Sequence, residues 1–210
     1  MTRYTRTEAA DLTTAWVEAT KHYTQSLLEA QRGALAAVGL VEDVELEDTK
    51  GTAYAGPEWE FERSVETPDA ISVGDTVRFT KTLSEEDVAT FAAASGDTNR
   101  LHLDDEFAEQ TRFGGRIVHG TLVAGIISAA LARIPGLTIY LSQDLRFLAP
   151  VEIGATVTAE TEILEDLGDN KYRLRTDVID QTDEETVIEG EAVVLIDDLP
   201  SDAEHSAAGQ

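Results

Sequence analysis

The stretch HGTLVAGIISAALARI, residues 119–134, decides the fold. Apolar side chains occur on nearly all of its sides, and Gly120, Gly125 and Ala129 keep a helix of this sequence thin. A helix that is apolar all round must be buried all round. Because the stretch also holds a histidine and an arginine and is flanked by charges, it predicts a buried helix rather than a membrane span.

Four strand candidates follow this helix, at residues 138–148, 155–165, 171–180 and 186–197. Short turns rich in Gly, Asp, Asn or Pro separate them. Long strands joined by short turns must pair antiparallel. The pattern therefore predicts an α+β domain in which a long antiparallel sheet wraps around a central apolar helix.

The segment before the helix carries two further signals. GDTVRFTKTL, residues 74–83, alternates apolar and polar side chains and indicates a strand. Ser84 and Asp87 then form the S-x-x-D capping signature of a helix that begins in SEEDVATFAAAS. A polar stretch, SGDTNRLHLDDEFA at residues 95–108, follows, and its Asp104, Asp105 and Glu106 are typical of the first turn of a short helix.

The rest of the chain suggests appendages to one domain. We expect an amphipathic N-terminal helix at residues 1–40, an acidic linker at 41–66, the main domain at 67–200 and a disordered tail at 201–210. The apolar stripe of the N-terminal helix includes Trp16, Tyr23 and Leu27. Such a stripe either docks on its own domain or binds a partner protein or an apolar granule surface, and the sequence leaves both open.

The composition narrows the class of protein. The 210 residues include 41 acids and 16 bases, a net charge of -25, and the acids are spread along the whole chain. Dispersed acids with few lysines indicate either adaptation to high salt or an ordinary acidic cytosolic protein. The charge argues against nucleic acid and anionic membranes as partners. No cysteine is present, so disulfides and cysteine metal sites are excluded. The N-terminal residues show no signal peptide pattern, so we expect a cytoplasmic protein.

The polar stretch places Asp97 five residues before His102. If the backbone there is extended, Leu101 and Leu103 face one way and His102 faces the other, toward Asp97. A carboxylate and an imidazole that both hydrogen-bond to one water molecule can remove a proton from it and supply a proton to a reacting group. Two other interpretations remain open: Asp97 caps a turn while His102 bonds to backbone, or Asp97, His102 and Asp104 bind a metal ion.

SGDTNRLHLDDEFA together with GGRIVHGTLVAGIISAAL resembles the MaoC-like, (R)-specific enoyl-CoA hydratase family, and the likeness extends over about residues 70 to 197. The family motif is roughly S-G-D-x-N-P-x-H followed by an I-V-H-G helix entry. The resemblance implies the hot-dog fold, a long helix wrapped by an antiparallel sheet. One departure is Arg100, which stands where the family has proline.

The resemblance implies that Asp97 and His102 are the catalytic pair, which adds water to a trans-2-enoyl thioester. Gly120 opens the buried helix, so its free N–H can stabilise the thioester oxyanion, and its lack of a Cβ lets the carbonyl approach closely. Ser128 falls where the family has a serine near the catalytic pair, although a buried serine bonded to its own helix is equally compatible with the pattern. Asn99, a turn former within the motif, is expected to contact the substrate. We expect His119 to order the turn through a backbone hydrogen bond rather than to act in catalysis.

The implied product is an (R)-3-hydroxyacyl-CoA, which could supply polyhydroxyalkanoate synthesis or fatty-acid metabolism. Coenzyme A enters only as part of the substrate, no other cofactor and no metal are expected, and the family implies a homodimer. Candidate partners for the coenzyme A phosphates are Arg112, Arg116 and Arg146, each of which could equally be a surface ion-pair partner. The alternatives are a hot-dog acyl-CoA thioesterase and a non-catalytic acyl-CoA-binding or scaffold protein.

Overall fold

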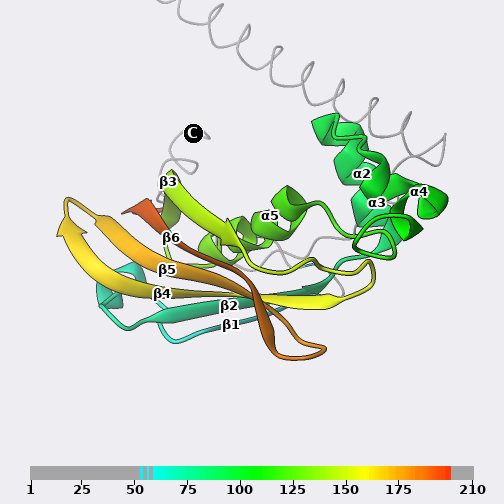
Figure 1. Ribbon diagram of the computed structural model, residues 1–210. Coiled ribbons are helices and arrows are strands. Elements are labelled where there is room, and N and C mark those ends of the chain that lie inside the picture. Colours follow the sequence, from blue (N-terminus) through cyan, green and yellow to red (C-terminus); the bar gives the residue numbers. More distant parts are fainter. Residues whose placement is uncertain (1–52, 54–55, 57–58, 200–210) are drawn as a thin grey trace, which may run out of the picture. The chain divides into compact units, whose positions relative to one another are not determined.

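The computed structural model describes residues 53, 56 and 59–199 (Figure 1). The expected N-terminal helix at 1–40 and the tail at 201–210 lie outside the described residues, as does most of the expected linker. Among the described residues, no helix is both long and apolar enough to cross a membrane.

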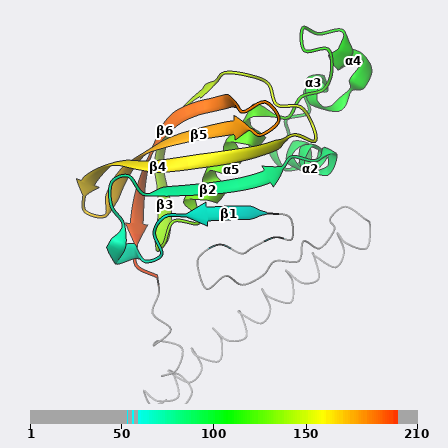
Figure 2. The same ribbon diagram turned by 90° about the horizontal axis from the view of Figure 1, so that it is seen from below.

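One six-stranded sheet forms the body of the described domain, and every neighbouring pair of strands is antiparallel (Figure 2). The strand order is β1-β2-β4-β5-β6-β3. The strands are β1 (Glu60–Arg63), β2 (Thr76–Thr82), β3 (Leu137–Phe147), β4 (Thr156–Gly168), β5 (Lys171–Asp180) and β6 (Glu185–Asp197). The five strands expected from alternation and turn signals are therefore confirmed.

Helix α5 (Gly120–Leu131) lies in the curve of the sheet and packs against β2, β4 and β5 (Figure 1). Its buried side chains join the main core, which confirms the α+β, hot-dog arrangement: Val123, Ile126, Ile127, Ala130 and Leu131. Burial is not complete, however, because Thr121, Gly125 and Ser128 are exposed on one face of α5. The expectation of burial all round is wrong within a single chain.

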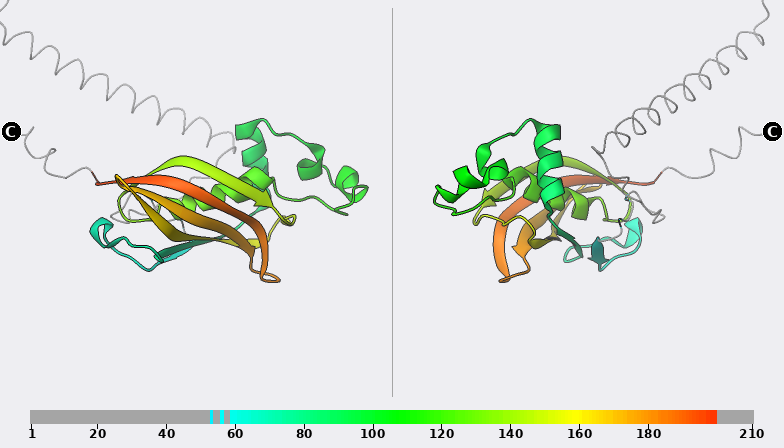
Figure 3. Two further views of the ribbon diagram at one scale, coloured as in Figure 1. Left: turned by 60° about the vertical axis from the view of Figure 1, so that its left-hand side comes forward. Right: turned by 90° about the vertical axis from the view of Figure 1, so that its right-hand side faces the viewer.

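The other three α-helices of the described residues gather at one end of the sheet (Figure 3). They are α2 (Glu85–Ser95), α3 (Arg100–Leu103) and α4 (Asp105–Glu109), and a short 3-10 helix, η1 (Pro68–Ala70), precedes β2. The residues of the sequence motif come together at this end of the sheet, as described below.

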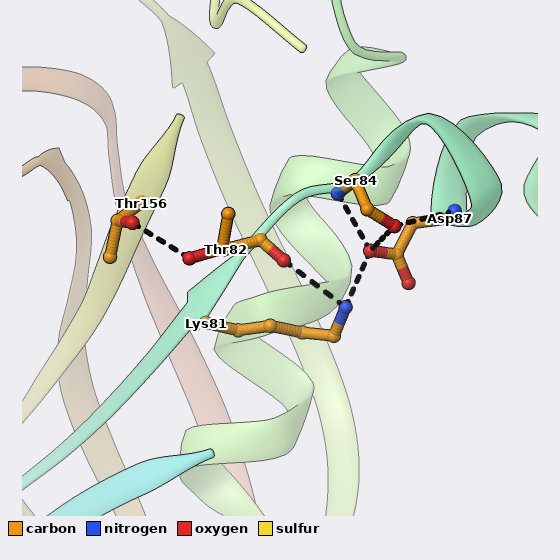
Figure 4. A network of polar contacts seen from close by, with 5 residues as sticks. All are labelled: Lys81, Thr82, Ser84, Asp87 and Thr156. Carbon is orange, nitrogen blue, oxygen red and sulfur yellow. Dashed lines mark hydrogen bonds and ion pairs between the residues drawn. The ribbon is translucent and has the colours of Figure 1, made fainter. Parts of the chain in front are cut away.

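The predicted capping signature starts α2 (Figure 4). Ser84 Oγ accepts the backbone N–H of Asp87 at 3.1 Å, and Asp87 Oδ2 accepts the backbone N–H of Ser84 at 2.8 Å. Lys81 Nζ also donates to Asp87 Oδ2 at 2.6 Å and thereby ties the end of β2 to the helix. Burial alone would raise the pKa of the Asp87 carboxyl, but the hydrogen bonds from Lys81 and Ser84 hold it below its usual value.

Two local expectations are wrong. Residues 60–63 were expected to be linker, yet they form β1, which pairs with β2 through partners such as Phe61 and Phe79. The argument that directs His102 toward Asp97 assumes an extended backbone, yet the backbone there forms the single turn of α3. In both places the short segment takes its structure from its neighbours, since a four-residue element shows little periodicity of its own.

Candidate active site

Asp97 lies in the loop between α2 and α3, and local hydrogen bonds fix its position. Helix α2 ends at Gly96, whose φ of 77° is a left-handed conformation that favours glycine. The Asp97 backbone N–H then donates to Ser95 Oγ at 3.1 Å, and Asp97 Oδ1 accepts the N–H of Asn99 at 3.3 Å. The side chain is exposed, so one end of the carboxylate is restrained by the loop while the residue remains accessible.

His102 is 8% exposed, whereas its neighbour Leu103 is 38% exposed, so the turn of α3 directs the imidazole inward. Its Nδ1 lies 2.7 Å from the backbone carbonyl oxygen of Ile117. Because a carbonyl only accepts, Nδ1 carries the proton in this bond. A neutral His102 therefore has its lone pair on Nε2, which is the nitrogen available for proton transfer.

His119 precedes α5 and is almost fully buried, with 1% exposure. Its Nε2 donates to the backbone carbonyl of Asp97 at 2.9 Å. Its ring stacks on that of His102, with centroids 3.9 Å apart and an angle of 29° between the planes. The expected backbone hydrogen bond is therefore present, but its acceptor is Asp97, 22 residues away, rather than the turn itself.

The three residues converge. A carboxylate oxygen of Asp97 and one ring nitrogen each of His102 and His119 lie within 4.8 Å of one another. Asp104, the third ligand in the metal interpretation, is instead the N-cap of α4, where its side chain accepts the N–H of Phe107 at 3.0 Å. The two backbone bonds need protons on His102 Nδ1 and His119 Nε2, which leaves the lone pairs of the neutral rings on His102 Nε2 and His119 Nδ1. The lone pair on His102 Nε2, close to the Asp97 carboxylate, can accept a proton.

A pocket of about 260 Å³ adjoins the cluster and is lined by His102 and Gly120. Its walls are mostly apolar and include Ile117, Phe147 and Ile188. Gly120 is the first residue of α5, so its N–H has no intrahelical partner and lies at the positive end of the helix dipole. One pocket thus combines a bare imidazole nitrogen, a nearby carboxylate and a helix N-terminus that can stabilise an oxyanion.

This constellation agrees with the comparisons to known proteins. The family model described as "MaoC like domain" matches residues 62–187, more than half of the chain. The chain belongs to the MaoC-like family. It is therefore a hydro-lyase of the MaoC-like dehydratase type.

Several proteins similar to this chain are named as hydratases or dehydratases. An "(R)-specific enoyl-CoA hydratase" of Rhodospirillum rubrum is 43% identical over 129 residues, which are 60% of this chain and 88% of the relative. A "3-hydroxybutyryl-CoA dehydratase" of Methylorubrum extorquens is 42% identical over 128 residues, 60% of this chain and 81% of the relative. The solved structure of R-hydratase PhaJ1 from Pseudomonas aeruginosa in the unliganded form gives a TM-score of 0.60 at 37% identity and covers 67% of this chain and 90% of that one.

Gly120 in this MaoC-like protein makes room for a neighbour. A Cβ placed on Gly120 would lie 3.0 Å from Cε1 of Phe147. Phe147 is 55% exposed and lines the same pocket. The ring of Phe147 thus lies in the space that the missing Cβ of Gly120 leaves open. The sequence did not indicate that Phe147 belongs to the site.

Two other expected residues are not among those that line this MaoC-like pocket. Asn99 Oδ1 accepts the N–H of Leu101 at 3.0 Å and so caps α3. Ser128 is exposed, eight residues beyond Gly120 and therefore about 12 Å along the helix. The substrate contact of Asn99 and the catalytic role of Ser128 therefore stay predictions, because the structure of a single chain places neither residue at this pocket.

Arg100 occupies the first helical position of α3. Its Nη2 and Nε donate to Asp104 Oδ2 at 2.6 and 2.9 Å, and its guanidinium lies 4.6 Å from the ring centroid of Phe107. The first position of a helix is also where proline is best tolerated. Side-chain bonds of Arg100 therefore restrain the turn at the position where the family has a proline.

Proposed function

We propose that this protein adds water to trans-2-enoyl-CoA and forms (R)-3-hydroxyacyl-CoA, which supplies polyhydroxyalkanoate synthesis or fatty-acid metabolism. The observation that carries the proposal is the convergence of Asp97 and His102 within 4.8 Å beside the pocket that contains Gly120. The (R) configuration is supported by the names of the relatives reported above.

The hydrogen-bond pattern supports a division of labour. Asp97 and the bare Nε2 of His102 hold one water, and His102 Nε2 takes a proton from it. The remaining hydroxide bonds to the β-carbon as the double bond opens. Negative charge that develops on the thioester oxygen is stabilised by the N–H of Gly120. The proton then passes from the pair to the α-carbon, which restores the resting protonation state and balances the addition of one water.

A thioesterase is the second candidate, because it would act on the same class of substrate. It would direct the water at the thioester carbonyl and release a thiol. The adjacent carboxylate and imidazole suit hydration, because that reaction needs one proton moved from water to the α-carbon as hydroxide bonds to the β-carbon. A non-catalytic acyl-CoA-binding protein would have no use for the paired proton-transfer groups.

One assay separates the three candidates. The protein is mixed with crotonyl-CoA in high salt, and both the enoyl absorbance and free thiol are followed. Hydration removes the enoyl absorbance without releasing thiol, and this is the expected result. Thiol release would instead identify a thioesterase, and neither change would identify a binding protein.

We further propose that the protein is a homodimer. Strand β3 is a free edge of the sheet, and its exposed apolar side chains include Leu137, Ile139 and Leu141. An edge strand of this kind pairs readily with another strand. A second copy that continues the sheet at β3 would cover this edge, and it could also cover the open face of α5. The mass of the protein in solution tests this proposal.

A further inference from the structure

We infer that Arg112 binds a phosphate group of the coenzyme A nucleotide while the acyl thioester occupies the pocket. This inference rests on the proposed function, since it names the part of the substrate that Arg112 contacts. Arg112 lines the same pocket as His102 and Gly120, and it is exposed to solvent. It therefore links the reaction site to solvent.

The other candidate arginines are already occupied by carboxylates. Arg116 donates to both carboxylate oxygens of Glu85 at 2.6 and 2.8 Å and to Asp105 at 2.7 Å. These hydrogen bonds, to Glu85 first and to Asp105 second, raise the pKa of the Arg116 guanidinium above its ordinary value. Arg146 pairs with Glu189 at 2.9 Å.

Arg112 differs from these arginines. Within residues 59–199, no carboxylate forms an ion pair with it. In a chain with 41 acids and 16 bases, a pocket arginine left without an acidic neighbour is available for an anion from outside. Its guanidinium instead lies 4.9 Å from the ring centroid of Phe113, a contact that restrains the planar group without neutralising its charge.

Phosphate is the anion that matches this position. The guanidinium fork can donate two parallel hydrogen bonds to phosphate oxygens. A net charge of -25 repels a polyanionic substrate at long range, so a local positive charge at the pocket has a specific role in binding it. The pocket of about 260 Å³ is small for a whole coenzyme A thioester, which places the nucleotide toward solvent, where Arg112 is exposed.

The test compares two substrates that carry the same acyl group. Crotonyl-CoA has the nucleotide phosphates, and crotonyl-pantetheine has none. For Arg112→Ala we expect kcat/KM to fall about tenfold with crotonyl-CoA, mainly through KM, and to stay unchanged with crotonyl-pantetheine. Arg112→Lys should recover part of the loss, because a lysine keeps the charge but not the fork. All assays are run at one ionic strength, since screening weakens the contact.

Arg146→Ala is the matched control, because it removes an exposed arginine that does not line the pocket. Arg146→Ala should leave kcat/KM unchanged with both substrates. An equal effect of Arg112→Ala on both substrates, or no effect on either, overturns the inference. Failure of the proposed function is distinguishable, because the unchanged protein would then hydrate neither crotonyl-CoA nor crotonyl-pantetheine.

Discussion

The imidazole of His119 stacks on the imidazole of His102 at 3.9 Å between ring centroids, and the same His119 ring donates a hydrogen bond to the backbone of Asp97. One buried side chain therefore contacts both members of the proposed catalytic pair. His119 Nδ1 has no hydrogen-bond partner among the described residues, so the ring is held by the Asp97 bond and by packing. We regard His119 as a positioning residue that sets the geometry of the pair.

Two substitutions separate the contacts of His119. His119→Gln can keep an N–H donor for the Asp97 carbonyl but loses the stacked ring, whereas His119→Phe keeps a ring and loses the donor. We expect His119→Phe to lower kcat about tenfold with little change in KM, because the Asp97 loop loses its tether. His119→Gln should retain more of the kcat. Steady-state kinetics with crotonyl-CoA give both constants, and a change in KM alone for both variants would contradict a positioning role.

Gly120 and Phe147 should behave as a coupled pair. Gly120→Ala keeps the backbone N–H but brings a methyl group to 3.0 Å from the ring of Phe147, which must then move within the pocket. We expect a lower kcat/KM with the fold intact, because the ring is half exposed and can shift. The double variant with Phe147→Ala should recover activity relative to Gly120→Ala. Additive losses in the double variant would show that the ring is not the cause.

Arg100→Pro is expected to be close to neutral. Proline at the first position of α3 gains about 0.4–1 kcal/mol from a more restricted unfolded chain. The exposed Arg100–Asp104 ion pair that it removes contributes little, because water solvates and screens both charges. Denaturant unfolding and turnover should both stay near those of the unchanged protein. A large loss of stability would show that the side-chain bonds of Arg100 are indispensable to the loop.

Acid should weaken the cap of α2. The pKa of Asp87 is lowered in the folded protein from an ordinary value of 3.8, so its contribution to stability is present above that value and is lost as the pH falls through the folded pKa. Asp87→Asn, which cannot carry the charge, should therefore be less stable than the unchanged protein at pH 7 and approach it below pH 3.8. Denaturant unfolding at a series of pH values measures this difference. A constant difference across the series would mean that the charge of Asp87 has no part in the cap.

The sequence was informative where a pattern is long or chemically specific. The apolar helix, the long strands, the Ser84–Asp87 cap and the pairing of Asp97 with His102 were all predictable in this way. The turn of α3 was not, because Leu101-His102-Leu103 alternates like a strand over too few residues to distinguish the two structures. The exposure of Ser128 depends on which face of α5 the sheet leaves open, and the contact of Gly120 with Phe147 joins residues 27 positions apart. Such tertiary relationships leave no local signal.

The account depends most on the proton-transfer roles of Asp97 and His102. Asp97→Asn removes the carboxylate, and His102→Asn can keep a donor for the Ile117 carbonyl while it removes the nitrogen that corresponds to Nε2. Each variant should lower kcat for crotonyl-CoA hydration at least about a hundredfold while the fold is retained. The most direct measurement is therefore the rate of loss of enoyl absorbance for these two variants beside the unchanged protein. Full hydratase activity in Asp97→Asn would contradict the assignment of the site.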